Sequence, residues 1–482
     1  MATISSPGLG SGLDVDAIVG QLVAIERRPI ELLTQQKTTL QAKLSSFGLL
    51  KSYTTNVQDA VSRLADPTLW QRTTALSSEA ATVSASSTAV AVPGNYSIQV
   101  SQLAQAHSLA SGVYASSSAS VGTGTLTIDL GSYDAGATFV ARTPPASVSI
   151  AIGIGEDSLE SVRAKINAAN AGVTASIVKD ASGARLAIQS SATGADSAIR
   201  ISVVADTPLP PLPTDPPSLA SLAYDPGVPT TSRLTQTLEA KNALATINGL
   251  GVSSTTNTFT DAIEGVSLNV ARVTTTAVQV RVGADNDAYK KAVTDFVKSY
   301  NEISNYLSAQ TKFDPDTKVA GALQGDRATL SLQTQLRTAI AQPSNASATY
   351  RTLTDLGIEL QKNGTLIVND NKLTAALGNL SEVGKAFSNA ATAGAGATGI
   401  AVRLKALTTA ANNSDGVVTT RSEALRASIK RSDTNVERYE LRVAATRTRL
   451  LAQYGALDTK LSTLSNLNTY ITQQFFNSSN SN

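Results

Sequence analysis

The C-terminal region of the chain carries an apolar residue at every seventh position, a spacing that few folds can use. The row runs through Ile429, Val436, Val443, Leu450, Leu457, Leu464 and Ile471. Such a repeat lines one side of an α-helix and is stable only when that side packs against another helix. At 1.5 Å per residue, a helix from Ile429 to Phe475 would be about 70 Å long. An ordinary core helix is the alternative, but a helix this long outruns the core of one domain and needs a further partner.

A second row accompanies the first only near the C-terminus. Its members there are Tyr454, Leu461, Asn468 and Phe475, whereas the equivalent upstream positions are Asp433, Glu440 and Arg447. We therefore expect a two-row seam only over the last three to four heptads, with the upstream half packed in its own helical domain. Asn468 would place an amide in the seam, where it costs stability but fixes register or subunit number.

The N-terminal region also predicts a long helix. Asp14 can cap a helix that places Ile18, Leu22 and Ile25 on one face, and Pro29 is expected to break or kink it. Helical spacing then resumes to about residue 65. Because both ends of the chain are helical, the simplest arrangement pairs them as one stalk, with the intervening sequence inserted between them.

The intervening sequence predicts strands from about residue 76 to residue 283, with one helix at 158–169 and a proline-rich connector at 207–231. Helices return after Asp285, and Asn363-Gly364 is a strong hairpin signal. The expected fold is α+β and multidomain, with a terminal coiled-coil stalk, a helical bundle and inserted antiparallel β-rich domains. The expected ranges are 1–42 with 437–482 for the terminal coiled-coil leg, 43–75 with 285–436 for the helical bundle and its β-hairpin, 76–106 with 235–284 for the inserted β domain, and 107–234 for the outer β-rich domain.

Residues that carry chemistry are scarce. The chain has no cysteine, one histidine (His107) and a net charge of +2, so thiol chemistry and a histidine-rich metal site are excluded and no nucleic-acid partner is indicated. The glycines at 8, 10 and 12 fit no phosphate-binding loop. No apolar run reaches the length of a membrane span, and the start of the chain lacks the pattern of a cleaved secretory signal. We expect no enzyme, no cofactor, no metal and no membrane partner.

Several segments resemble the flagellar filament cap family, also called flagellar hook-associated protein 2 (FliD family). The opening GLGSGLDVDAIVGQLVAIERRPIELL and the closing RTRLLAQYGALDTKLSTLSNLNTYITQQF are similar to that family's terminal motifs. ATINGLGVSSTTNTFTDAIEGVSLNV, GALQGDRATLSLQTQLR and LTDLGIELQKNGTLIVNDNKL resemble its central segments, and SLESVRAKINAANAGVTASIVKDASGARLAIQSSATGAD resembles the flagellin IN motif. The proline-rich stretch at 207–231 matches none of these motifs.

The resemblance implies a secreted structural cap at the distal tip of the bacterial flagellar filament. It implies a homo-oligomeric ring of four to six subunits that promotes folding and insertion of exported flagellin, with terminal helices acting as legs. Further implied partners are the hook-associated junction proteins and the export apparatus with its chaperone. The residues expected at the interface with neighbouring subunits and flagellin are Ile18, Leu22, Ile25, Leu450, Tyr454, Leu457, Leu461, Leu464, Asn468, Ile471 and Phe475.

Two other functions remain open at this stage. Another flagellar axial protein, such as a hook–filament junction protein or flagellin itself, shares helical termini and inserted β domains. A surface adhesin would instead use the β-rich region at 77–283 to bind mucin or glycans, and adhesion is compatible with a cap.

Overall fold

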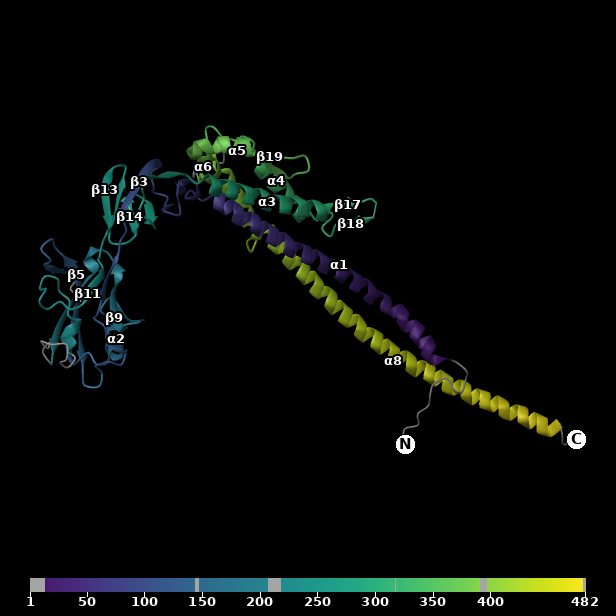
Figure 1. Cartoon of the computed structure of the whole chain (residues 1–482). Coiled ribbons are helices and arrows are strands. Elements are labelled where there is room, and N and C mark those ends of the chain that lie inside the picture. The colour runs from purple at the N-terminus through teal and green to yellow at the C-terminus, as the bar shows by residue number, and fades with distance from the viewer. Residues whose placement is uncertain (1–13, 144–146, 207–217, 317, 391–396, 480–482) are drawn as a thin grey trace. The chain divides into compact units, whose positions relative to one another are not determined.

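The chain divides into two compact units, one of which interrupts the other in the sequence. In the computed structural model the described residues are 14–143, 147–206, 218–316, 318–390 and 397–479. The first unit, here called the helical unit, joins residues 1–70 to residues 286–482, and the second, the β unit, is residues 71–285. Long terminal helices with an antiparallel β insertion confirm the expected fold class (Figure 1).

The helical unit is built around its two terminal helices. Its helices are α1 (Val15–Leu64), α3 (Asn286–Thr311), α4 (Arg327–Ala341), α5 (Asp370–Ala376), α6 (Leu380–Ser388), α7 (Ile400–Asn412) and α8 (Val417–Ser479). Two short hairpins join them, β17 (Phe313–Asp314) with β18 (Val319–Ala320), and β19 (Ile358–Leu360) with β20 (Leu366–Val368). The predicted Asn363-Gly364 turn lies between β19 and β20 and is confirmed, with Gly364 at φ 85°.

Helix α1 begins where the sequence predicts and continues past the residue expected to stop it. The Asp14 carboxylate accepts a hydrogen bond from the Ala17 N–H at 2.9 Å, which caps the helix. Pro29 lies inside the helix, and the expected break does not occur. Proline removes its own N–H from the helical ladder and its ring crowds the carbonyl of Ile25, so continuation of the helix depends on packing of the surrounding turns, as at the buried Ile30.

The core of the helical unit is fixed at two points by side chains from distant parts of the sequence. The Trp70 ring stacks on Phe387 at 5.2 Å and on Tyr289 at 5.6 Å. Asp326 caps α4, and the same carboxylate accepts a 2.9 Å hydrogen bond from Arg421 on α8, although its side chain is only 1% exposed. A carboxylate this buried is stable only when paired, so this contact attaches α4 to the start of α8.

Residues 73–102 and 243–284 of the β unit, here called its inner half, form a two-layer antiparallel sandwich. The five-stranded sheet has the order β1 (Thr73–Ser77), β16 (Val278–Ala284), β3 (Gly94–Gln102), β12 (Ala243–Ile247) and β13 (Leu250–Ser254). The three-stranded sheet has the order β14 (Thr258–Ile263), β15 (Val266–Val270) and β2 (Val83–Ser87). Alternating Val, Ile and Leu residues from both sheets form one buried cluster, as the period of two requires.

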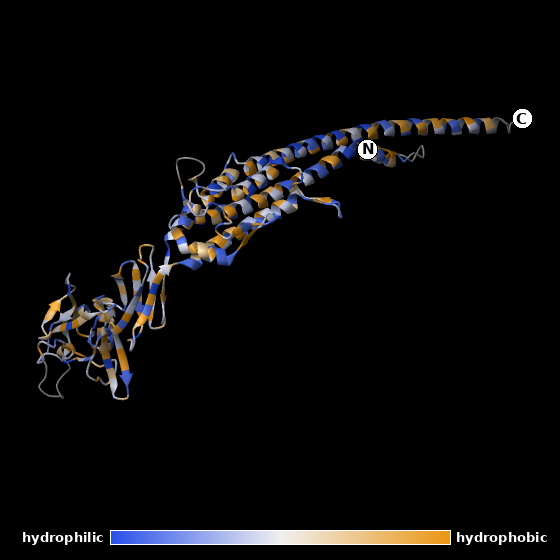
Figure 2. Cartoon of the chain, turned by 90° about the horizontal axis from the view of Figure 1, so that it is seen from above, coloured by the Kyte–Doolittle hydropathy of each residue, from blue (hydrophilic) through white to orange (hydrophobic). Residues whose placement is uncertain are grey.

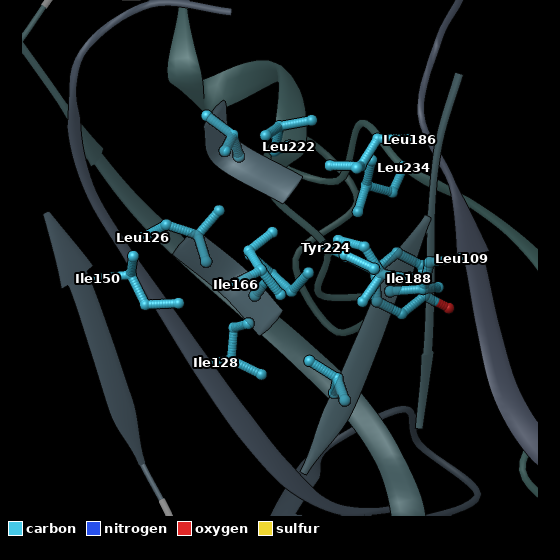
Figure 3. Packing of buried hydrophobic residues seen from close by; sticks show 14 of the residues in the cluster. Leu109, Leu126, Ile128, Ile150, Ile166, Leu186, Ile188, Leu222, Tyr224 and Leu234 are labelled. Atoms are coloured by element: carbon cyan, nitrogen blue, oxygen red, sulfur yellow. The ribbon is translucent and has the colours of Figure 1, made fainter. Parts of the chain in front are cut away.

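Residues 106–238 of the β unit, here called its outer half, hold a second hydrophobic core (Figure 3). One sheet has the order β10 (Ala198–Ala205), β5 (Gly124–Tyr133) and β6 (Phe139–Ala141), and β7 (Val148–Ile152) also pairs with β5. The other has the order β11 (Thr235–Leu238), β4 (Ala106–Ala110), β9 (Gly183–Thr193) and β8 (Val173–Asp180). Helix α2 (Leu159–Ala168) buries Leu159, Val162 and Ile166 in this core.

The single histidine is a structural residue of this outer core. His107 is 2% exposed; its Nδ1 accepts the Ile199 N–H at 2.9 Å, which leaves Nε2 as the donor toward Gln236 Oε1 at 3.4 Å. Burial disfavours the charged ring and lowers the pKa of His107 below its ordinary value of 6.5, against the smaller opposite effect of Gln236. Protonation would also destroy the acceptor that the Ile199 N–H uses.

We predict that the imidazole of His107 titrates below pH 6.5 in the folded chain. Since its folded pKa is lowered, the unfolded state binds the proton more readily, and the β unit loses stability as pH falls below 6.5. The chain contains one histidine, so the ring gives one assignable NMR signal without further labelling schemes. A titration midpoint at or above 6.5 would show that the ring is hydrated.

Candidate functional site

The pairing of α1 with α8 organises the terminal part of the helical unit. On α1 one row of buried or half-buried positions follows steps of three and four. It consists of Val19, Val23, Glu26, Ile30, Leu33, Lys37, Leu40, Leu44 and Phe47. On α8 the facing positions follow the same steps and are Leu425, Ile429, Ser432, Val436, Tyr439, Val443, Thr446 and Leu450. This spacing is that of a coiled-coil seam. The two helices lie side by side in both views of the chain (Figures 1 and 2).

Ion pairs fix the antiparallel register of this seam. Arg27 meets Glu440 at 3.3 Å, Arg442 meets Glu26 at 3.6 Å, and Lys37 pairs with Asp433. Most of these side chains are about half exposed, so each pair contributes only about 0–1 kcal/mol to stability. Their value is geometric, because the three pairs form together in this one register.

The sequence correctly predicts one row of the seam and misplaces the other. Ile429, Val436, Val443 and Leu450 do line the seam, but Asp433, Glu440 and Arg447 do not form its second row. That row is Leu425, Ser432, Tyr439 and Thr446, which precede the first row by four residues instead of following it. Ser432 is buried and Thr446 half-buried, and small hydroxyl residues of this kind add nothing to an apolar repeat in the sequence. The two-row seam therefore extends along the upstream half of α8, where the sequence predicted none.

The expected contact face of α1 is also different. Ile18 is half-buried, but Leu22 and Ile25 are exposed, Ile25 by 60%, and none of the three belongs to the α8-facing row. Together with Pro29 and with Leu32, which is 66% exposed, they form a second stripe beside the seam. Within one chain these residues therefore do not face α8, and α1 has two apolar faces, of which α8 covers one.

Helix α8 is longer than its partner. Since the ion pairs give one constant register, Val15 at the start of α1 lies opposite about residue 454 of α8. Tyr454 and Leu461 are half-buried, but every described side chain from Thr463 to Phe475 is exposed. This part of α8 reaches beyond the start of α1 in both views (Figures 1 and 2). We call residues 455–475 the α8 tail.

The α8 tail exposes a row of large apolar side chains among polar ones. Its large exposed side chains are Leu457, Leu464, Leu467, Tyr470, Ile471 and Phe475, with Leu464 exposed by 60% and Phe475 by 72%. Asn468 is exposed, so within one chain it has no seam to occupy. Gly455 marks the start of the tail and weakens the helix by about 1 kcal/mol relative to alanine. Most of the expected interface residues are thus exposed, on α1 or on the tail. Ile18, Tyr454 and Leu461 are half-buried, and Leu450 belongs to the α1–α8 seam.

Neither a membrane span nor a metal site occurs among the described residues. None of their helices combines the length and hydropathy of a membrane span. Across the same ranges, no group of three His, Asp or Glu side chains is placed as a metal site requires. What the terminal region offers is apolar surface and arginine side chains, which serve protein contacts.

Comparison with known proteins agrees with this description. The family of the flagellar hook-associated protein 2 N-terminus matches residues 11–107, that of its C-terminus matches residues 240–466, and the flagellin hook IN motif matches residues 127–192. The chain is 30% identical to flagellar hook-associated protein 2 of Escherichia coli (strain K12), over 100% of both chains. It is 32% identical to the A-type protein of Pseudomonas aeruginosa, over 94% of this chain and 93% of that one.

A solved structure is also similar to this chain in fold. The crystal structure of the D1-D2-D3 domains of the flagellar cap protein FliD from Escherichia coli matches with a TM-score of 0.61 and 29% identity, covering 79% of this chain and 99% of that one. The chain belongs to the flagellar hook-associated protein 2 family. The expectation of a structural flagellar cap at the filament tip is confirmed, in preference to a junction protein or flagellin.

We predict that two isoleucines on α1 differ sharply in their contribution to stability. Replacing Ile30, which is 8% exposed in the seam, with alanine should lower the free energy of opening of α1 and α8 by about 2 kcal/mol or more. Replacing the exposed Ile25 with alanine is the matched control and should change it by no more than about 0.5 kcal/mol. Hydrogen exchange of amides in α1 and α8 measures both values. Equal effects would contradict the assigned seam.

Proposed function

We propose that the chain forms a ring at the filament tip, in which the α1–α8 pair is a leg and the α8 tail contacts flagellin and neighbouring subunits. The observation that supports this proposal is the exposed apolar row of the tail, which begins just past the residues of α8 that lie opposite the start of α1. An apolar helix face of this length is stable in water only when covered. A cap needs such surfaces at its legs, because it must hold an arriving subunit before that subunit is locked into the filament.

The tail is suited to reversible contact. An isolated helical segment of about 20 residues is only marginally stable in water, so the tail gains full helical order when it docks. The ordering cost is subtracted from the contact energy and keeps the contact from becoming permanent. A leg that binds and releases lets the cap advance as the filament lengthens. Asn468 then has a role in the docked state, where an amide among apolar residues selects one register.

We also propose a role for each segment of the chain, a subunit number for the ring and its further partners. Residues 1–42 with 437–482 serve as the leg, 43–75 with 285–436 as the bundle that anchors it, and 76–106 with 235–284 and 107–234 as the plate of the cap. The ring contains four to six copies and meets the junction proteins before the first flagellin arrives. Export proceeds through the flagellar export apparatus with a chaperone. The interface residues proposed for the leg are Ile18, Leu22, Ile25, Leu450, Tyr454, Leu457, Leu461, Leu464, Asn468, Ile471 and Phe475.

We predict that the double variant Leu464→Asp, Ile471→Asp abolishes capping. Both side chains are exposed in the isolated chain, so folding of the helical and β units should be unchanged, whereas burying two carboxylates at the docked interface is strongly unfavourable. Filament length in a strain whose only cap protein is the variant is the measurement, and the expected result is secretion of unassembled flagellin.

The matched control places the same two charges on neighbouring residues of the tail, Ser465→Asp and Thr472→Asp. The control should retain most of the filament growth, because these residues lie off the apolar row. Normal filaments with Leu464→Asp, Ile471→Asp would show that the tail row does not contact flagellin or a neighbouring subunit.

A further inference from the structure

Two ion pairs mark the two sides of the α1–α8 seam. Glu26 and Arg442 meet on one side, and Arg27 and Glu440 meet on the other. Residues three, four or seven positions away share a side of a helix, so these pairs assign the flanking residues of both helices. On the Glu26 side of α1, Leu22 and Pro29 lie four and three positions from Glu26. Ile25 and Leu32 lie three positions after Leu22 and Pro29 and continue the same side. We call these four residues the α1 stripe.

The α1 stripe continues a contact surface that the chain itself already uses. In steps of seven from Ile25 and Leu32, the same face of α1 reaches Ser46 and Tyr53. There α3 covers it: the Tyr306 hydroxyl donates to the Ser46 carbonyl at 2.7 Å, and the rings of Tyr53 and Tyr306 are 5.0 Å apart. Helix α3 ends at Thr311, close to that level. Beyond it the same face is left open, and its apolar residues resume at Leu32.

The charged residues on the neighbouring edge of α8 are all basic. Its flanking positions on the Arg442 side carry three further exposed arginines, Arg431, Arg438 and Arg449. Among the described residues no carboxylate lies within ion-pair distance of these three, and Arg438 donates only to Asn435 Oδ1 at 2.8 Å. The acidic residues of this part of α8, Asp433, Glu437 and Glu440, lie on the opposite side of the seam.

We propose that the α1 stripe and these arginines form one groove that takes a single amphipathic helix of the filament subunit, with a row of carboxylates along one flank. The apolar residues of that helix cover Leu22, Ile25 and Leu32, and its carboxylates pair with Arg431, Arg438 and Arg449. The docked helix lies along α1 in line with α3 and extends the existing bundle by one member. This inference rests on the proposed function and specifies the partner chemistry of the leg.

A second copy of the chain satisfies the groove poorly. The helical end that α1 leaves uncovered is the α8 tail, and the sequence from Gly455 to Asn482 contains one acidic residue, Asp458. It can supply apolar contacts but not the carboxylates that three arginines require. Charge complementarity therefore favours a helix from a different polypeptide.

Charge reversal tests the proposal in the assembled system. The triple variant Arg431→Glu, Arg438→Glu, Arg449→Glu should reduce filament growth in a strain lacking the native chain by at least about tenfold. The matched control, Arg426→Glu, Lys430→Glu, Arg447→Glu, changes net charge equally with exposed residues on the other side of the seam, and it should retain growth. Equal effects of the two variants on filament growth would contradict the proposed groove.

Crosslinking identifies the occupant without altering the arginines. Because the chain has no cysteine, Ile25→Cys carries a single photoreactive label, and Glu31→Cys on the other side of α1 is the control. Labelled cap on growing filaments of purified flagellin should crosslink to flagellin from position 25 and not from position 31. A crosslink between two cap chains, or none, overturns the proposal. If the unlabelled native chain failed to support filament growth, the result would contradict the proposed function and not the groove alone.

Discussion

The antiparallel seam between α1 and α8 is the constraint on which the rest of the structure depends. It joins residues more than 400 positions apart, and it unites the two sequence segments of the helical unit, between which the 215 residues of the β unit, from 71 to 285, are inserted in the sequence. Its apolar positions supply the stability, since each buried Ile, Leu or Val contributes about 1.5–3 kcal/mol. Its ion pairs contribute little energy but select one register, and that register determines which surfaces of the terminal helices stay uncovered.

Two uncovered surfaces follow from this register. The first arises from unequal length, because α8 continues past the start of α1 and exposes the row that includes Leu464 and Ile471. The second arises because α1 carries a further apolar face beside the seam. Helix α3 covers this face near Ser46 but not near Ile25. Both surfaces belong to the part of the molecule that the family resemblance assigns to the leg. A structural cap has no reaction to catalyse, so its specificity must reside in surfaces of this kind.

The sequence predicted what depends on local interactions. The order of helices and strands, the Asp14 cap and the Asn363-Gly364 turn each involve residues close together in the chain. It failed where the outcome depends on distant partners. Ser432 and Thr446 are seam residues because of what α1 places opposite them, and Pro29 is tolerated because its neighbours pack on α8. The apolar residues Ile18, Leu22 and Ile25 were correctly seen as one face, but no local signal shows that Val19, Glu26 and Ile30 face α8 instead.

Hydrogen exchange with mass spectrometry, on the isolated chain and on the chain bound at filament ends, tests the central claim most directly. In both states amides of α1 and of α8 up to about residue 454 should be protected, because the seam is internal to the chain. Residues 455–475 should exchange rapidly in the isolated monomer and become protected on the filament. Equal protection of residues 455–475 in the isolated monomer and on the filament would contradict the account, since the tail would then have no need of an external partner.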